Sequence, residues 1–135
     1  MVRIVLDTNV IVSALKSPRG NEARVLRLAL AGGFALCVSA AILREYEGVL
    51  RRPRFGFAEQ MVDAFMDEMM AIGVTVKPRA RVSASPDEDD NRFLECAESA
   101  GARFLVSGNA RHFPREWKGT RVVNARELLE ETLGI

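Results

Sequence analysis

The sequence is poor in cysteine and has no long apolar run. Only two of its 135 residues are cysteines, Cys37 and Cys96, and they form no C-x-x-C pattern. Both lie in apolar stretches, so we expect buried, reduced thiols rather than a disulfide or a zinc site. No apolar stretch approaches the ~18 residues of a membrane span. Arg3 and Asp7 interrupt the first apolar run, which argues against a signal peptide and predicts a cytoplasmic protein with no membrane partner.

An excess of charge of one sign is also missing. The 19 basic and 18 acidic residues leave a formal net charge of +1, which excludes a protein that coats nucleic acid by bulk charge. Any nucleic-acid site must therefore come from local placement of charge. Four consecutive carboxylates do occur, at residues 87–90. No repeat or low-complexity segment is present, and the length predicts a single domain over residues 1–135 that needs no disulfide or structural metal.

The apolar residues that are present fall into short runs and helical periodicities. Five short, mostly apolar runs are typical of buried strands: residues 3–6, 34–38, 74–76, 104–106 and 121–123. Helices are expected between them, at residues 9–15, 21–30, 40–52, 57–72 and 90–100, and after residue 124. Asn21, Ser39 and Asn124 are the expected N-caps, and residues 107–119 are expected to form a polar loop. Continuously apolar strands between helices indicate an α/β fold with a parallel sheet buried on both faces.

Oxygen-bearing side chains follow four of these strands. In an open parallel sheet, ligands bind beyond the carboxyl ends of the strands. Asp7 follows the first strand, Ser39 the second with Glu45 two turns into its helix, residues 87–90 the third, and residues 107–109 the fourth. Carboxylates gathered at one edge repel each other, and a hard cation such as Mg²⁺ or Mn²⁺ resolves that conflict. Such an ion activates water and orients a phosphodiester, so the pattern favours a nuclease.

Each of these residues also has a simpler structural interpretation. Asp7 can cap the helix that follows it, and Glu45 can be an exposed helix charge. Asp90 can favour the dipole of a helix N-terminus, an interaction worth about 0.3–1 kcal/mol. Asn109 can be a turn residue, because asparagine tolerates the left-handed region. It is the combination of the four, in this order along the chain, that favours a site.

Four segments resemble the motifs of the PIN-domain family, in the right order and spacing over nearly the whole chain. They are residues 5–15, 39–50, 86–97 and 105–109. The resemblance implies a three-layer α/β/α fold whose central parallel sheet has about five strands in the order 3-2-1-4-5. It also implies Mg²⁺- or Mn²⁺-dependent cleavage of RNA. Many small single-domain members are toxins of toxin–antitoxin pairs, so it further implies a toxin-like role, an antitoxin partner and a homodimer.

By motif match, the expected catalytic residues are Asp7, Glu45, Asp90 and Asn109, and the same four are the expected metal ligands together with Asp87. Residues expected to bind substrate or to orient ligands are Thr8, Asn9, Ser39, Ser107, Arg111 and His112. The fourth motif of the family usually ends in Asp, whereas Asn109 offers an oxygen without a charge. We therefore expect weaker binding of a second metal ion or a site for one metal ion only, and low activity is a further expectation.

Two alternative functions depend on the residue found at a single position, Asn109 for the first and Asn9 for the second. Asn109 leaves open a PIN domain that binds RNA or a protein partner without cutting. A phosphatase of the haloacid-dehalogenase type also begins with Asp after a first strand. That family needs a second Asp two residues on, where this chain has Asn9.

Overall fold

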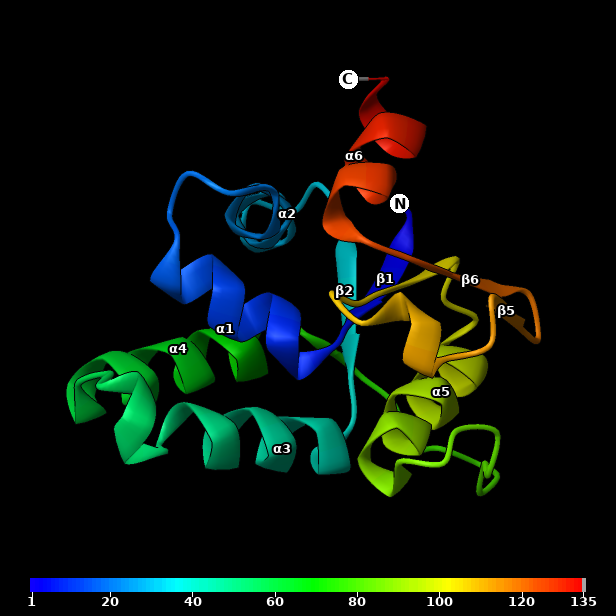
Figure 1. Ribbon diagram of the computed structural model, residues 1–135, viewed down its shortest axis with the longest axis horizontal. Coiled ribbons are helices and arrows are strands. Elements are labelled where there is room, and N and C mark those ends of the chain that lie inside the picture. The colour runs from blue at the N-terminus through cyan, green and yellow to red at the C-terminus, as the bar shows by residue number, and fades with distance from the viewer. Residues whose placement is uncertain (135) are drawn as a thin grey trace.

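The computed structural model describes residues 1–134, which form one sheet with helices on both faces (Figure 1). In chain order the elements are β1 (Arg3–Leu6), α1 (Thr8–Lys16), α2 (Asn21–Leu30), β2 (Ala35–Val38), α3 (Ala40–Leu50), the 3-10 turn η1 (Pro53–Phe55), α4 (Glu59–Ile72), β3 (Val74–Thr75), α5 (Glu88–Ala100), β4 (Phe104–Val106), the 3-10 turn η2 (Ala110–His112), β5 (Glu116–Trp117), β6 (Thr120–Val123) and α6 (Ala125–Leu133).

The sheet has the strand order β3-β2-β1-β4-β6-β5, and all neighbouring strands are parallel except β5 and β6. The register places Ile4 beside both Leu36 and Phe104. In Figure 1, α1 and α2 lie on one side of β1 and β2, and α5 lies on the other. Because both faces are covered, residues 4–6, 36–38 and 104–106 are all buried, which is why these strands are continuously apolar.

The expected three-layer α/β/α class and the order of the parallel strands are confirmed, with one strand added. β5 lies in the segment that was predicted to be a polar loop, and it pairs antiparallel with β6. Lys118 and Gly119 form the turn, with φ values of 49° and 88°. A strand of two residues is too short to show a periodicity, so the sequence pattern could not indicate it.

Helix ends agree with the predictions where a capping side chain is decisive. Ser39 accepts a hydrogen bond from the N–H of Ile42 at the start of α3, and Asn124 forms a reciprocal capping box with Glu127 in α6. Gly20, rather than Asn21, is the N-cap of α2. The other differences are the starts of α1, α4 and α5, which lie at residues 8, 59 and 88, and the ends of α1 and α3, which lie at residues 16 and 50.

The helix α5 begins two residues earlier than predicted because Asp87 caps it. The Asp87 side chain accepts the N–H of Asp89 at 2.9 Å, and the following three acids occupy the first turn. Acidic side chains are stabilised there by the helix dipole. The run of carboxylates thus forms a helix start.

The environment of the two cysteines and the character of the helices can be compared with what the sequence led us to expect. Cys37 and Cys96 are both buried and free, as expected, and burial raises the pKa of each thiol. Within residues 1–134, no helix combines the length and the apolar character that crossing a membrane requires.

Candidate active site

Asp7 lies where β1 ends and α1 begins, at the sheet edge that it shares with the carboxyl ends of β2 and β4. One carboxylate oxygen accepts the N–H of Thr8 at 2.8 Å, and the other accepts the hydroxyl of Ser107 at 2.7 Å. The side chain is only 7% exposed. Asp7 is therefore a helix cap and also a carboxylate of fixed orientation at the strand edge, so its two interpretations are compatible.

A small network ties the loop after β4 to the start of α1. The hydroxyl of Ser107, which donates to Asp7, accepts the N–H of Asn109 at 2.9 Å. The side-chain oxygen of Asn9 accepts the N–H of Gly108 at 3.0 Å, and its amide nitrogen donates to Ser107 across 3.5 Å. These contacts fix the loop that carries Asn109.

Four carboxylates from three parts of the chain line one open pocket of about 400 Å³, here called the acidic pocket. Asp7 comes from the end of β1, Glu45 from α3, and Asp87 and Asp90 from the start of α5. The predicted site residues that also line it are Thr8, Asn9, Asn109 and His112. All five expected metal ligands therefore meet in this pocket.

A neighbouring pocket of about 600 Å³ continues the site. It shares Asp87, Asp90 and His112 with the acidic pocket and adds Arg111. The cationic side chain of Arg111 thus lies beside the carboxylates rather than among them. A phosphodiester backbone that crosses the acidic pocket would contact Arg111 next.

Two of the expected substrate-binding residues do not line either pocket. Ser39 is 1% exposed and uses its hydroxyl to cap α3, so its expected contact with substrate is corrected to a structural role. Ser107 is fully buried and reaches the site through its hydrogen bonds with Asp7, Asn9 and Asn109. Both follow a strand, but the side chain that follows a strand can point into the fold as well as out of it.

Some residues of the acidic pocket carried no clear signal in the sequence. Phe55 lines it, together with Arg54, Val12, Ser13 and Val49. Phe55 stands in the short η1 turn, outside any periodic segment, so neither helical nor strand spacing could place it.

The carboxylates of the acidic pocket are difficult to ionise together. Burial raises the pKa of Asp7 from 3.8 to about 6; the hydrogen bond from Ser107 lowers it, while the charges of Asp90 and Glu45 raise it. Burial also raises the pKa of Glu45 and of Asp90, and neighbouring acids add to both effects. Each of these three groups therefore favours its neutral form more than a free carboxyl does.

No arginine forms an ion pair with the carboxylates of the acidic pocket within residues 1–134. Within residues 1–134, the ion pairs are formed by other acids: Glu47, Asp63, Glu88, Glu95, Glu130 and Glu131. Without forming an ion pair, the charge of Arg52 lowers the pKa of Glu45, and the charge of His112, which lines the pocket, lowers the pKa of Asp90. Negative charge in the pocket is thus left without a direct partner in the described part of the chain.

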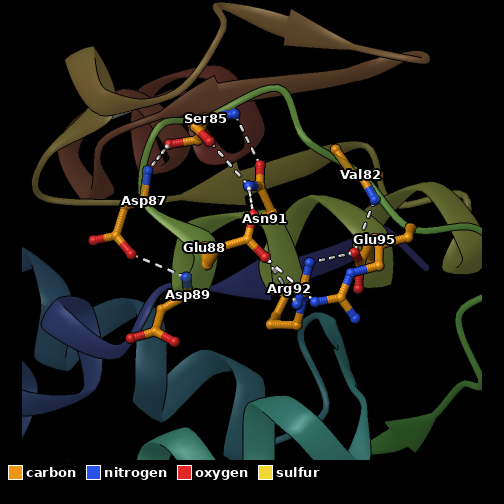
Figure 2. Close-up of polar contacts among 9 residues, drawn as sticks. Val82, Ser85, Asp87, Glu88, Asp89, Asn91, Arg92 and Glu95 are labelled. Atoms are coloured by element: carbon orange, nitrogen blue, oxygen red, sulfur yellow. Dashed lines mark hydrogen bonds and ion pairs between the residues drawn. The ribbon is translucent and has the colours of Figure 1, made fainter.

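The loop that leads into α5 is clamped to that helix by two of its side chains (Figure 2). Asn91 is fully buried; its side-chain oxygen accepts the N–H of Ser85 at 2.8 Å, and its amide donates to the carbonyl of Ser85 at 2.9 Å. One turn on, Glu95 accepts the N–H of Val82 at 2.8 Å and pairs with Arg92 at 2.7 Å. The clamp fixes the segment from which the acids at 87 and 90 reach the pocket.

The donor set of the acidic pocket fits a hard divalent cation. It offers carboxylate, amide and hydroxyl oxygens, which Mg²⁺ and Mn²⁺ prefer. The hydroxyl oxygen of Thr8 is buried and has no hydrogen-bond partner among residues 1–134, so an ion or its water would satisfy it. No three His, Cys, Asp or Glu side chains in that range are grouped tightly enough to hold an ion alone. A cation here would keep several water ligands, as Mg²⁺ usually does.

Comparison with known proteins identifies relatives of this chain. Residues 3–111 match the PIN domain family. An uncharacterized protein from Methanocaldococcus jannaschii is 26% identical over 111 residues, which span 80% of this chain and 71% of the relative. The fold is similar to that in the crystal structure of VapBC2 from Rickettsia felis bound to a DNA fragment from their promoter. That similarity has a TM-score of 0.60 and 17% identity, and it covers 91% of this chain and 98% of that one.

Proposed function

Since the chain belongs to the PIN-domain family, we propose that it is a metal-dependent endoribonuclease whose active site is the acidic pocket. The observation that carries the proposal is that Asp7, Glu45, Asp87 and Asp90 share one pocket, while the ion pairs of residues 1–134 involve other acids. Such an arrangement is costly for a folded protein unless a cation neutralises it. The chemistry that needs a cation among carboxylates includes hydrolysis of a phosphodiester.

The carboxylates of the pocket would hold the ion. A bound Mg²⁺ or Mn²⁺ would lower the pKa of a water molecule and stabilise negative charge on the phosphate. Asp7, Glu45 and Asp90 are the proposed principal ligands, with Asp87 and the uncharged oxygen of Asn109 as further ones. Burial makes Asp7 the acid that gains most from a nearby cation, because its pKa is about 6 without one.

Polar neighbours of these acids would position the substrate. Ser107 holds one oxygen of Asp7 and thereby orients the other oxygen of that carboxylate. Thr8 and Asn9, which line the same pocket, are proposed to orient water or a phosphate oxygen. Arg111 and His112 are proposed to contact the RNA backbone in the neighbouring pocket.

Cleavage of a labelled, mixed-sequence RNA with Mn²⁺, Mg²⁺ or EDTA tests this function. We expect metal-dependent cutting by the wild type and none by the Asp7→Asn, Asp90→Asn double variant. The matched control is Asp67→Asn, Glu68→Gln, which removes two exposed charges from α4 outside the pocket. Cutting in EDTA, or equal cutting by the two double variants, would contradict the proposal.

Asn109 supports a second candidate function, in which the domain binds RNA or a protein without cutting. The residue lines the pocket but supplies no charge. The exposed Met70 on α4, 60% accessible, would then belong to a contact surface, whereas Met66 and Met69 of the same segment are core residues. Cleavage that appears only in Asn109→Asp would favour this candidate over an active nuclease.

We also propose a toxin-like role, with an antitoxin as the partner, a homodimeric state and a cytoplasmic location. The similar fold of VapBC2, which was crystallised with DNA from its own promoter, supports it. Proteins that bind their own promoter can control their own expression, and a toxin and its antitoxin require such control. Induction in a bacterial host should arrest growth, and Asp7→Asn should abolish the arrest. Light scattering of the purified protein should give twice the chain mass of 14.9 kDa.

A further inference from the structure

Phe55 is a half-buried aromatic residue on the wall of the acidic pocket. From its position and its neighbours we infer that it is a stacking platform for a base of single-stranded RNA beside the cleavage site. The inference rests on the proposed function for the identity of the nucleic acid. The platform is defined here as Phe55 with the two cations on its ring, Lys16 and Arg54.

The ring of Phe55 is not used to build the core. Phe57, two residues on, is one of the half-buried apolar side chains that pack against the core, whereas Phe55 is not one of them within residues 1–134. The two rings lie 5.9 Å apart and nearly parallel, at 18°. Phe57 therefore anchors Phe55 to the fold while Phe55 lines an open pocket. A phenylalanine that contributes apolar surface to a pocket without serving the core is suited to an aromatic ligand.

Two exposed cations already lie on this ring. The guanidinium carbon of Arg54 is 4.7 Å from the ring centroid, and the ammonium nitrogen of Lys16 is 5.3 Å from it. Aromatic rings combined with mobile cations are the arrangement that binds single-stranded nucleic acid, since the ring stacks on a base and the cations contact phosphates. Neither cation forms an ion pair within residues 1–134, so both are available for phosphate.

The turn that carries Phe55 is preorganised. Pro53 starts η1, and Gly56 ends it with φ of 66°, a conformation that side chains with a Cβ rarely adopt. Proline and glycine together therefore hold the ring in place before any ligand arrives. Val12 and Val49 line the same pocket and add apolar surface near the ring, while the carboxylates supply the acidic part of the wall. One nucleotide can thus place its base on the apolar part while its phosphate approaches the cation that the acidic part is proposed to hold.

Binding of single-stranded RNA in EDTA isolates the platform from catalysis when every protein compared, the wild type at Phe55 included, carries Asp7→Asn and Asp90→Asn, because these changes remove two of the pocket charges that would repel phosphate. The probe is a short RNA that carries one 2-aminopurine, whose fluorescence changes when it stacks. We expect Phe55→Leu to weaken binding about 5- to 150-fold, the range for loss of one stacked base. Phe55→Tyr, which keeps the ring, should bind like the wild type. Replacing the stacked base by an abasic spacer should weaken binding to the wild type but not to Phe55→Leu.

Trp117→Leu is the matched control, because it removes another half-buried aromatic ring with a lysine over it, 5.7 Å from Lys118, outside the acidic pocket. It should leave RNA affinity unchanged, with folding of every variant checked by thermal melting. Lys16→Gln should reduce the slope of log affinity against log salt by about 0.7, the value for one phosphate contact on a single strand.

The outcomes separate this inference from the nuclease itself. Ring-dependent RNA binding without metal-dependent cutting would support the platform and contradict the nuclease. Metal-dependent cutting with the same RNA affinity and KM in Phe55→Leu would overturn the platform and leave the nuclease standing. Absence of RNA binding by the wild type would also overturn the platform, and Phe55 would then be assigned to contact with a protein partner.

Discussion

Replacing Asp7 with asparagine removes a charge that the metal-free fold holds at a cost. The pKa of Asp7 rises from 3.8 to about 6, chiefly because the side chain is buried. Each tenfold change in proton affinity is worth about 1.4 kcal/mol, so ionised Asp7 costs the metal-free protein about 3 kcal/mol. Asparagine has nearly the same shape and keeps an oxygen that accepts the N–H of Thr8, but its amide nitrogen replaces the oxygen that accepts the hydroxyl of Ser107, so the full value is an upper limit. We therefore expect Asp7→Asn to be more stable than the wild type at pH 8, by up to about 3 kcal/mol.

The dependence on pH has a definite sign. A carboxyl whose pKa is raised in the folded state is neutral in both states below about pH 3.8, and there its charge costs nothing. Between pH 3.8 and about 6 the unfolded chain releases its proton first, so the stability of the wild type falls as the pH rises. The advantage of Asp7→Asn should grow over that interval and remain constant above it.

Urea denaturation in EDTA at pH values from 4 to 8 measures this difference. The control, Asp67→Asn, removes an exposed carboxylate of α4 and should change stability by less than about 0.5 kcal/mol. Addition of Mn²⁺ or Mg²⁺ should then stabilise the wild type but not Asp7→Asn, in proportion to the logarithm of the free ion concentration. The reasoning is refuted if Asp7→Asn has no advantage at pH 8, or if its advantage is the same at pH 4.

Three further substitutions probe the surroundings of the site. Asn91→Ala should lower the free energy of unfolding by about 2–3 kcal/mol, because two hydrogen bonds to the clamped loop are lost, and it should weaken stabilisation by Mn²⁺ in the same urea titrations. Thr8→Val should change stability by less than about 1 kcal/mol, since its hydroxyl has no partner within residues 1–134, yet calorimetry should show weaker Mn²⁺ binding; unchanged affinity would exclude Thr8 from the metal site. Gly73→Ala should destabilise by about 1–3 kcal/mol, because the added Cβ would lie 2.6 Å from the carbonyl oxygen of Met69; a neutral effect on the thermal midpoint would contradict this packing.

Prediction and structure agree best where a sequence pattern has a direct physical cause. The runs at residues 4–6 and 104–106 have no polar residue because both faces of the sheet are covered, so continuous apolarity was enough to predict them. Asn124 caps α6 as predicted, with Glu127 completing the capping box, because such a cap depends only on neighbours along the chain. The strand β5 escaped prediction because its two residues owe their conformation to pairing with β6.

Some residues of the candidate site could be predicted from the sequence, and others could not. Asp7 and Glu45 could be proposed from their places after apolar strands, because parallel strands bring their ends to one edge. The sequence could not distinguish Ser39, which is buried in a helix cap, from a residue that faces the pocket. It also gave no indication of Phe55, whose importance depends on which pocket its turn reaches.

By itself, the sequence determined the α/β class, the strands and the acids that follow them, since those depend on local apolarity and on the common direction of parallel strands. Only the tertiary structure decided which side-chain oxygens lie together at the acidic pocket. Ser107 holds Asp7 from 100 positions away, and the clamp of Asn91 fixes the loop that leads to the acids of α5. Burial at that meeting point raises the pKa of Asp7, and burial depends on how distant segments pack, which no local pattern specifies.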